Sequence, residues 1–493
     1  MTDATVGISG IALSVPGHRV PLESWSNWYG HDWGKVRAVV GTGFRVADNQ
    51  ENAYTLAANA CLKLIEQYEI DPRRIGLLAL GTESSTDNSA GAVIVRGMLD
   101  LALRERHRAP LNREVEVPEF KHACLGGIYA LKAALRYVAT DAGDDVAIVV
   151  ASDIAEYERG SSGEQTQGAG AVALLVERDP SLLAIDLPFG SASSFRGADF
   201  RKPLRRYADK SSWAASGKMH DFPIFNGKYS TSCYIDETLQ ATRSLARRRR
   251  VPMAELLDQA GAILMHRPYH HMPVAAMSAI GLAALAHDAE RSQLFASLCA
   301  DAGVDATDVR RELGSETDLY RMFLDGGHDR DPFPTASKVI KVYRGHTSFK
   351  DRIQAKMKIG SELAKELGNL YSASLPAWIA AAFEDALERD DDLTGASWLA
   401  IGYGSGNASE AFSARVVEGW RASARKIGFR AALSGARDIS QIEYEALHAG
   451  EGDPREFHRP HGGFVIDRVG ATDTPAFQDL GVEYYRYQPG DRR

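Results

Sequence analysis

Cys124 is the residue whose type and position most clearly predict chemistry. It stands in Lys121-His122-Ala123-Cys124-Leu125-Gly126-Gly127, where a short loop is predicted to turn into a helix. The positive end of a helix dipole and its unpaired N–H groups favour the thiolate form of a cysteine. A thiolate can attack a thioester and hold the acyl group. For a lone cysteine, a buried structural role is the ordinary alternative. Whether Cys124 is catalytic therefore depends on which other reactive residues the chain contains.

Two further reactive side chains follow predicted buried strands. Glu83 comes after residues 75–80, where partial burial would raise the pKa of its carboxyl group toward the range useful for a base. Its alternative role is to cap a helix. His266 follows residues 262–265, and Pro268 ends that strand, so the imidazole is placed to bond a thioester or ketone oxygen. His270 and His271 lie close in sequence, but no carboxylate or cysteine stands near enough to complete a metal site, and we predict none.

An amide and a glycine loop complete the set. Asn369 opens a predicted helix, either as its N-cap or as an amide that bonds an acyl carbonyl. Tyr403-Gly404-Ser405-Gly406 follows a strand and offers backbone N–H groups for an oxyanion. Thiol, imidazole, amide and carboxylate together suit acyl transfer with formation of a carbon–carbon bond.

Composition narrows the class of protein. The chain has 493 residues, of which 44% are hydrophobic and 25% charged, with a net charge of −8 that does not favour nucleic-acid binding. The run Arg247–Arg250 is read either as a solvated helix end or as a docking patch for a phosphate or an acidic carrier protein. The four cysteines form no CxxC pair, and no apolar run reaches the roughly 18 residues of a membrane span. We therefore expect a cytoplasmic protein that does not bind membranes.

Alternating apolar runs and helical patterns predict an α/β architecture. The expected strands, read as buried and parallel, are residues 6–15, 75–80, 146–151, 171–176, 262–265 and 398–402, and the expected helices are 55–69, 125–140 and 373–388. A weakly repeated pattern of strands, polar turns and helices suggests two similar halves, residues 1–180 and 181–420. An extension over residues 421–493 follows and contains strand-like stretches at 463–468 and 482–487. Residues 181–235 are expected to be irregular and to wrap the site.

Over residues 5–487 these motifs resemble, in order, the 3-hydroxy-3-methylglutaryl-CoA (HMG-CoA) synthase family of the thiolase-like superfamily. The resemblance rests on Gly81-Thr82-Glu83-Ser84 with Asp87 and Ser89, Ala123-Cys124 with Gly126-Gly127, 152–157, 166–172, 200–203, 226–230 with Cys233-Tyr234, His266-Arg267-Pro268-Tyr269, 368–371 and 403–406. It implies a thiolase-like fold of two related βαβαβαββ halves that form an α-β-α-β-α layered core.

The resemblance also implies roles. Cys124 would take the acetyl group of acetyl-CoA, and Glu83 would remove a proton from the acetyl methyl group. The carbanion would attack the ketone of acetoacetyl-CoA, polarised by His266 and Asn369, and water would release HMG-CoA for a mevalonate route. The N–H groups of Cys124 and Ser405 would stabilise the oxyanion. The implied substrate-binding residues are Tyr157, Thr166, Phe200, Ser230, Asn369, Tyr371 and Ser405.

Two departures leave alternatives open. Lysines that contact CoA phosphates in the family are replaced here by His271 and Ala275, and Leu125 stands where a tyrosine often follows the cysteine. An HMG synthase of polyketide β-branching, acting on carrier-bound chains, is therefore the runner-up. A ketosynthase-type enzyme would not need Glu83, and a non-catalytic scaffold would need none of the reactive residues. We expect CoA thioesters as substrates, no cofactor, an acyl carrier protein as a candidate partner, and a homodimer.

Overall fold

A computed structural model describes residues 5–85, 90–197, 199–200, 202, 222–224, 226–451 and 461–490. The central element is a ten-stranded mixed sheet, in which the order β10-β11-β12-β8-β1-β7-β6-β4-β5 is extended by β9 pairing with β12. Its strands are β1 (Val6–Ser14), β4 (Ile75–Gly81), β5 (Glu119–Phe120), β6 (Val146–Ala155), β7 (Gly168–Arg178), β8 (Leu183–Ile185), β9 (Gly190–Ser193), β10 (Ala262–Met265), β11 (Ser397–Gly404) and β12 (Ala408–Val416).

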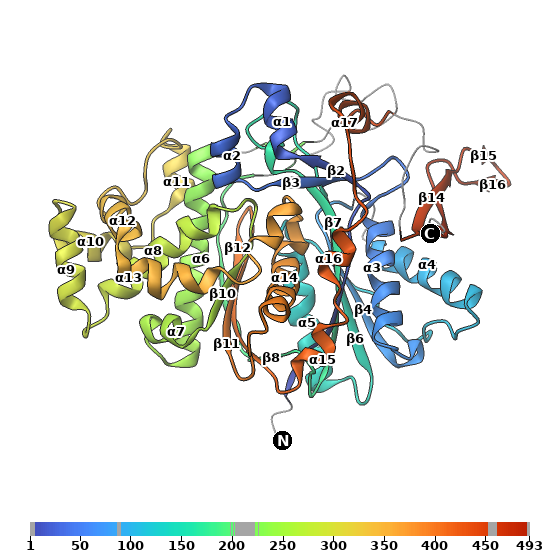
Figure 1. Cartoon of the computed structure of the whole chain (residues 1–493), viewed down its shortest axis with the longest axis horizontal. Helices are drawn as coiled ribbons and strands as arrows, with labels where there is room; N and C mark the ends of the chain where they lie inside the picture. Colours follow the sequence, from blue (N-terminus) through green and yellow to red (C-terminus); the bar gives the residue numbers. More distant parts are fainter. Residues whose placement is uncertain are drawn as a thin grey trace.

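Helices cover both faces of the sheet in alternating layers. Helices α3 and α4 cover the outer face of the strands β1, β4, β6 and β7. Helices α6 and α8 cover the outer face of the strands β9 to β12, on the opposite side of the molecule (Figure 1). Between the two groups of strands lie α5 and α14, whose side chains join one hydrophobic core with both. The α-β-α-β-α order confirms the predicted fold class. These helices are α3 (Ala53–Gln67), α4 (Gly91–Glu105), α5 (Gly126–Thr140), α6 (Gly227–Arg249), α8 (Met272–Ala286) and α14 (Ser374–Arg389).

Smaller elements surround this core. A three-stranded sheet of β2, β3 and β13 lies beside α1, α2 and α17, and five short helices, α9 to α13, extend from α8 (Figure 1). Their bounds are β2 (His18–Pro21), α1 (Leu22–Tyr29), α2 (Trp33–Val39), β3 (Gly43–Val46), α7 (Met253–Gln259), α9 (Ser292–Asp301), α10 (Ala306–Gly314), α11 (Leu319–Leu324), α12 (Ala336–Gly345), α13 (Thr347–Arg352), α15 (Trp420–Ala424), α16 (Phe429–Leu433), β13 (Arg437–Asp438) and α17 (Gln441–His448).

The chain ends in an antiparallel pair, β14 (Gly463–Val469) and β17 (Glu483–Gln488), with the small hairpin of β15 (Asp473–Thr474) and β16 (Phe477–Gln478) between them. Phe464 of β14 packs into the core formed by α3 and α4. This confirms the two strands predicted near the C-terminus. The boundaries of the halves at 180 and 420 stay a prediction.

Two predictions about the elements were wrong. The runs read as parallel strands form a mixed sheet, because β1 with β7, β6 with β7 and β11 with β12 pair antiparallel. Continuous apolar runs report burial on both faces, and here helices provide that burial whatever the strand direction. The stretch 181–235 is also not wholly irregular, since it contains β8, β9 and the start of α6. That helix buries polar residues such as Asp236, Thr238 and Thr242, which conceals its helical pattern.

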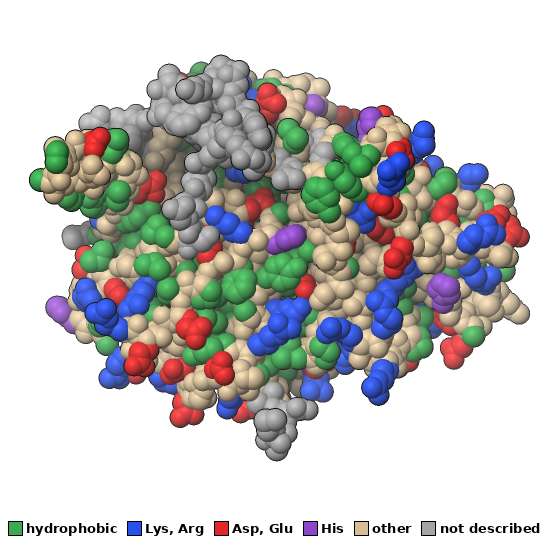
Figure 2. All heavy atoms as spheres, turned by 180° about the vertical axis from the view of Figure 1, so that it is seen from behind, with side chains coloured by type: hydrophobic (Ala, Val, Ile, Leu, Met, Phe, Trp, Pro, Cys, Tyr) green, Lys and Arg blue, Asp and Glu red, His purple; other side chains and the backbone are tan. Residues whose placement is uncertain are grey.

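The surface mixes charges. On the face opposite to that of Figure 1, basic and acidic side chains are interspersed with hydrophobic ones (Figure 2). Within the described ranges, no helix is both long and apolar enough to cross a lipid bilayer.

A glycine contact brings the ends of β4 and α5 together. A Cβ atom at Gly81 would lie 2.4 Å from the nitrogen and 2.5 Å from the Cα of Gly127, so the two backbones meet directly. This contact sets the end of β4, which is followed by Glu83, beside the start of α5, which follows Cys124. A side chain at position 81 would force the two backbones apart.

We expect Gly81→Ala to destabilise the protein by about 1–3 kcal/mol, because the methyl group overpacks a backbone contact. The apparent midpoint of thermal unfolding should fall by several degrees. Gly97→Ala is the matched control. Gly97 lies on α4, where a Cβ atom would meet nothing within 4 Å beyond the helix's own backbone, and alanine there should raise stability by up to about 1 kcal/mol. Equal midpoints for Gly81→Ala and the wild type would contradict the close contact.

Candidate active site

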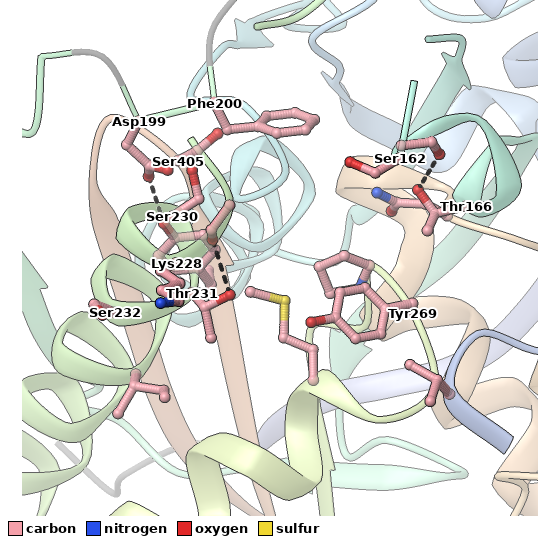
Figure 3. A pocket seen from close by; sticks show the side chains of 18 of the residues that line it. Ser162, Thr166, Asp199, Phe200, Lys228, Ser230, Thr231, Ser232, Tyr269 and Ser405 are labelled. Carbon is pink, nitrogen blue, oxygen red and sulfur yellow. Dashed lines mark hydrogen bonds between the residues drawn. The ribbon is translucent and has the colours of Figure 1, made fainter. Parts of the chain in front are cut away.

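One cavity of about 670 Å³ collects most of the predicted site residues. Its wall comes from both halves of the chain, and Figure 3 shows side chains from these separate elements pointing into the same space. The predicted residues that line it are Cys124, Tyr157, Thr166, Phe200, Ser230, His266, Asn369 and Ser405. Glu83 and Tyr371 are not part of this lining.

A tight turn presents Cys124 immediately before α5. The N–H of Leu125 donates to His122 O at 3.0 Å, and that of Gly126 donates to Ala123 O at 3.2 Å. Ala123 has a φ of 45°, a left-handed conformation that is unfavourable for a residue with a side chain. Strain of this kind is held in place by the surrounding structure and gathers at functional sites.

The environment of the Cys124 thiol differs from the expectation. Only 7% of the residue is exposed. Burial raises the pKa of the Cys124 thiol well above its usual range, and the negative charges of Glu83, Asp153 and Asp199 raise it further. The prediction that the helix end favours the thiolate was therefore wrong for the resting protein, because desolvation and three nearby carboxyl groups outweigh the helix dipole.

Glu83 is held by a buried carboxylate on β6. One oxygen of Asp153 accepts from the N–H groups of Glu83 at 2.8 Å and Ser84 at 3.0 Å. Its other oxygen accepts from the N–H of Ser372 at 2.9 Å. Asp153 thus joins the end of β4 to the segment before α14. Although part of Glu83 reaches solvent, burial of its carboxyl group raises the pKa of Glu83 to about 8, with repulsion by Asp153 adding and Lys202 opposing.

His266 enters the cavity as a neutral ring. It follows β10 directly, and its backbone carbonyl accepts a hydrogen bond from the hydroxyl of Tyr234 at 2.6 Å. Burial lowers the pKa of His266 to about 3. Neither ring nitrogen has a hydrogen-bond partner among the described residues. Buried polar atoms are nearly always paired, so both ring nitrogens are open to a bound group as far as the described residues go.

Asn369 fixes a local turn without being the N-cap of a helix, and its bond to an acyl carbonyl stays a prediction. Its side-chain oxygen accepts from the N–H of Tyr371 at 2.9 Å and from the hydroxyl of Ser374 at 3.1 Å, which fixes the local turn. Its amide NH₂ group is thereby turned the other way, toward the hydroxyl of Tyr157 at 3.4 Å. The amide is therefore oriented as a donor on the cavity wall.

Aromatic rings form a wall around the thiol. Tyr157, Phe200 and Tyr371 pack with their ring centroids 5.8 to 6.3 Å apart, in one cluster with Cys124. Tyr371 is fully buried behind this wall, so it supports Tyr157 and Phe200 instead of lining the cavity. Phe200 and Tyr371 have φ values of 29° and 43°, so two more residues of the cluster around Cys124 have strained backbone.

Further polar residues line both sides of the cavity, with Asp199, Ser230 and Ser405 near Phe200 and Thr166 across from them (Figure 3). Ser230 is hydrogen-bonded to Asp199, whose carboxylate also accepts from the hydroxyl of Tyr403 at 2.8 Å (Figure 3 shows the first of these bonds). The Tyr403 ring is stacked on His266 at 6.3 Å. The hydroxyl of Ser405 is buried without a partner among the described residues, and that of Thr166 donates to Gly163 O at 2.7 Å. Asp199 was missed from the sequence, where it follows no predicted strand or helix.

Comparisons with known proteins place this site in a family. Residues 2–181 match the family model "Hydroxymethylglutaryl-coenzyme A synthase N terminal", and residues 218–439 match the corresponding C-terminal model. The chain belongs to the hydroxymethylglutaryl-CoA synthase family. The predicted resemblance, and the prediction of an enzyme of this type, are confirmed.

Individual relatives agree with this membership. The hydroxymethylglutaryl-CoA synthase of Haloferax volcanii is 27% identical over 437 residues, 85% of this chain and 86% of that protein. The solved structure of MvaS in complex with 3-hydroxy-3-methylglutaryl coenzyme A is 27% identical, covers 99% of this chain and 100% of its own, and has a TM-score of 0.75. The HMG synthase of the curacin biosynthetic pathway in complex with holo donor-ACP is 19% identical, with 98% and 100% coverage and a TM-score of 0.68, and so shows the common fold.

The structure shows what surrounds Leu125 and His271, two residues that differ from the hydroxymethylglutaryl-CoA synthase pattern. Leu125 is fully buried between α5 and β11 and does not line the cavity. The Nε2 atom of His271 is hydrogen-bonded to the guanidinium of Arg344, and Nδ1 of His270 lies 3.1 Å from that of Arg267. Guanidinium groups at these two rings oppose a metal cation there. Motif residues Asp87, Ser89, Arg201 and Pro203 lie outside the described residues.

Proposed function

We propose that this protein joins an acetyl group, carried on Cys124, to the ketone of an acetoacetyl thioester to give HMG-CoA and free CoA, in a mevalonate route. The observation that carries the proposal is the meeting of four groups at one cavity: the Cys124 thiol, the unpartnered His266 ring, the Asn369 amide and, beside them, Glu83. They are the nucleophile, the carbonyl-binding groups and the base that such a condensation needs.

The first step is acyl transfer. The sulfur of Cys124 attacks the carbonyl carbon of acetyl-CoA, the carbon–sulfur bond to CoA breaks, and the thiol proton ends on the departing CoA sulfur. Because the resting thiol is protonated, its proton must leave as the bond forms. Backbone N–H groups of Cys124 and Ser405 are proposed to bind the oxyanion.

The second step forms the carbon–carbon bond. Glu83 removes a proton from the methyl group of acetyl-Cys124, and the carbanion attacks the ketone carbon of acetoacetyl-CoA. The neutral His266 ring and the Asn369 amide donate hydrogen bonds to the oxygen that becomes an alkoxide, and the proton that Glu83 removed returns to this oxygen to give the hydroxyl. Water then cleaves the thioester to Cys124, which restores the thiol and leaves a free carboxylate on HMG-CoA.

The substrates are proposed to be acetyl-CoA and acetoacetyl-CoA, with no other cofactor. The MvaS complex with 3-hydroxy-3-methylglutaryl coenzyme A, at 27% identity over almost the whole chain, supports CoA as the carrier. A donor acyl carrier protein is the alternative, since the curacin HMG synthase was solved with one. Tyr157, Thr166, Phe200, Ser230 and Ser405 are proposed to shape the acyl site, with Tyr371 behind them.

Assembly and location are also proposals. A homodimer follows from the resemblance stated for the sequence. A cytoplasmic location fits the four cysteines, Cys61, Cys124, Cys233 and Cys299, all of which are free and buried.

Incubation of the wild-type protein with acetyl-CoA and acetoacetyl-CoA tests the function. We expect HMG-CoA by mass spectrometry, together with one free CoA thiol per product, and the same yield when a metal chelator is present. Product from acetyl and acetoacetyl groups on acyl carrier proteins, but none from the CoA thioesters, would favour the polyketide type of reaction. Failure with both carriers would contradict catalysis of this condensation.

A further inference from the structure

A second hollow, of about 340 Å³, lies at the end of α6 that is remote from the catalytic cavity. It is enclosed by the last turns of α6, the beginning of α7 and the end of α8, and its polar lining is Arg243, Arg247, Arg250 and His287. The first turn of α6 lines the catalytic cavity through Thr231. The same helix lines the catalytic cavity as far as Ile235, and its first residue in the hollow is Arg243, eight residues or about 12 Å farther along. The hollow is therefore a separate feature of the molecule.

The three arginines line one hollow. Arg243 and Arg247 are four residues apart and so share one face of α6, and Arg250, the left-handed C-cap that follows the helix, lines the same hollow. The two intervening arginines do not line the hollow: Arg249 pairs with Asp186 at 2.6 Å, and Arg248 is exposed. Cations at a helix C-terminus commonly complement the helix dipole, which accounts for basic residues here in general. It does not account for three guanidinium groups gathered around one hollow.

The hollow holds more positive than negative charge among its described lining residues. No ion pair joins Arg243, Arg247 or Arg250 to an acid within the described ranges, and the guanidinium of Arg243 instead donates to the neutral backbone carbonyl of Leu313. Burial lowers the pKa of Arg243, and the charge of Arg247 lowers it further, with Asp236 and Glu316 opposing. Burial also lowers the pKa of His287, with Arg243 and Arg310 adding, which favours a neutral ring. An anion in the hollow would relieve this repulsion.

The rest of the lining is apolar. Val251, Pro252, Ala283 and Ala284 provide a wall suited to carbon atoms beside the cationic end. Guanidinium groups match the geometry and the double charge of a phosphate better than those of a single carboxylate. We propose that this hollow binds a small organic phosphate, with the phosphate on Arg243, Arg247 and Arg250 and the carbon part against the apolar wall.

Calorimetric titration with hexyl phosphate, and separately with inorganic phosphate, tests the proposal. The wild type is expected to bind hexyl phosphate more tightly than inorganic phosphate. Arg247→Ala should weaken binding of hexyl phosphate by about tenfold or more, since it removes a charge-assisted bond. Arg248→Ala, the same change one residue further along, should leave the affinity within about twofold because it affects only the general surface charge.

Three results would overturn the proposal. Equal weakening by the two variants would show non-specific attraction to a basic surface. Displacement of hexyl phosphate by acetyl-CoA would locate it in the catalytic cavity. Absence of binding heat at millimolar ligand would show that the hollow has no affinity for phosphates. Thermal unfolding of each variant controls for misfolding, and Arg247 is exposed, so its replacement should not lower stability.

Discussion

Cys124→Ala is expected to abolish the covalent acetyl-enzyme and to lower the rate of condensation by at least about 10³-fold, because Cys124 is the only cysteine among the described residues that line the cavity. Intact-mass spectrometry after mixing with acetyl-CoA measures this directly. The wild type should gain the mass of one acetyl group and the variant none. The effect should be large because the thiol is the group through which acetyl passes from CoA to the new carbon–carbon bond.

Cys299→Ala is the matched control. Cys299 is as buried as Cys124 but lies on α9, away from the cavity, so this variant should acetylate like the wild type. An acetyl adduct that persists in Cys124→Ala would contradict the assignment of the nucleophile. If neither the wild type nor the control gains an adduct from acetyl-CoA or from an acetyl carrier protein, the scaffold interpretation becomes the better one.

The positions of the reactive residues could be predicted because they follow simple local rules. Cys124 precedes a glycine-started helix, and Glu83 and His266 each follow a buried strand, so their places depend on short stretches of sequence. The layered arrangement of the sheet then brings the ends of β4 and β10 and the start of α5 to one cavity. Alternation of strands and helices predicted an α/β architecture, and the family resemblance implied the order of its layers.

The electrostatics of the site could not be predicted in the same way. The pKa of Cys124 depends on Asp153 and Asp199, which approach from β6 and from the segment after β9. No spacing in the sequence reports that these carboxyl groups converge on the thiol. The place of Tyr371 could not be predicted either. It is two residues from Asn369 in sequence, but its side chain is fully buried behind Tyr157 and Phe200 and does not line the cavity. The strand directions were mispredicted because a run of buried residues does not show whether strands pair parallel or antiparallel. Helix α6 was missed because its buried residues include polar ones, which conceal the helical pattern.

Glu83→Gln is expected to separate the two chemical steps. Above pH 8, where Glu83 is charged, acetylation of Cys124 should proceed at least as fast as in the wild type, because removing that charge removes one cause of the raised thiol pKa. Condensation should fall by about 10²–10⁴-fold, the usual contribution of a general base. Intact mass and product formation, measured on the same sample, distinguish the two steps.

The pH dependence of the wild type gives an independent test of Glu83. A base must be ionised, and burial with repulsion by Asp153 raises the pKa of Glu83 to about 8. The rate of condensation from acetylated enzyme should therefore rise about tenfold per pH unit below 8 and level off above it. Glu83→Asp keeps a carboxylate but withdraws it by one methylene, so it should retain a reduced rate with a pH-dependent rise. If Glu83→Gln condenses at the wild-type rate, Glu83 is not the base, and a ketosynthase-type reaction, which needs no such carboxylate, becomes the better account of this site.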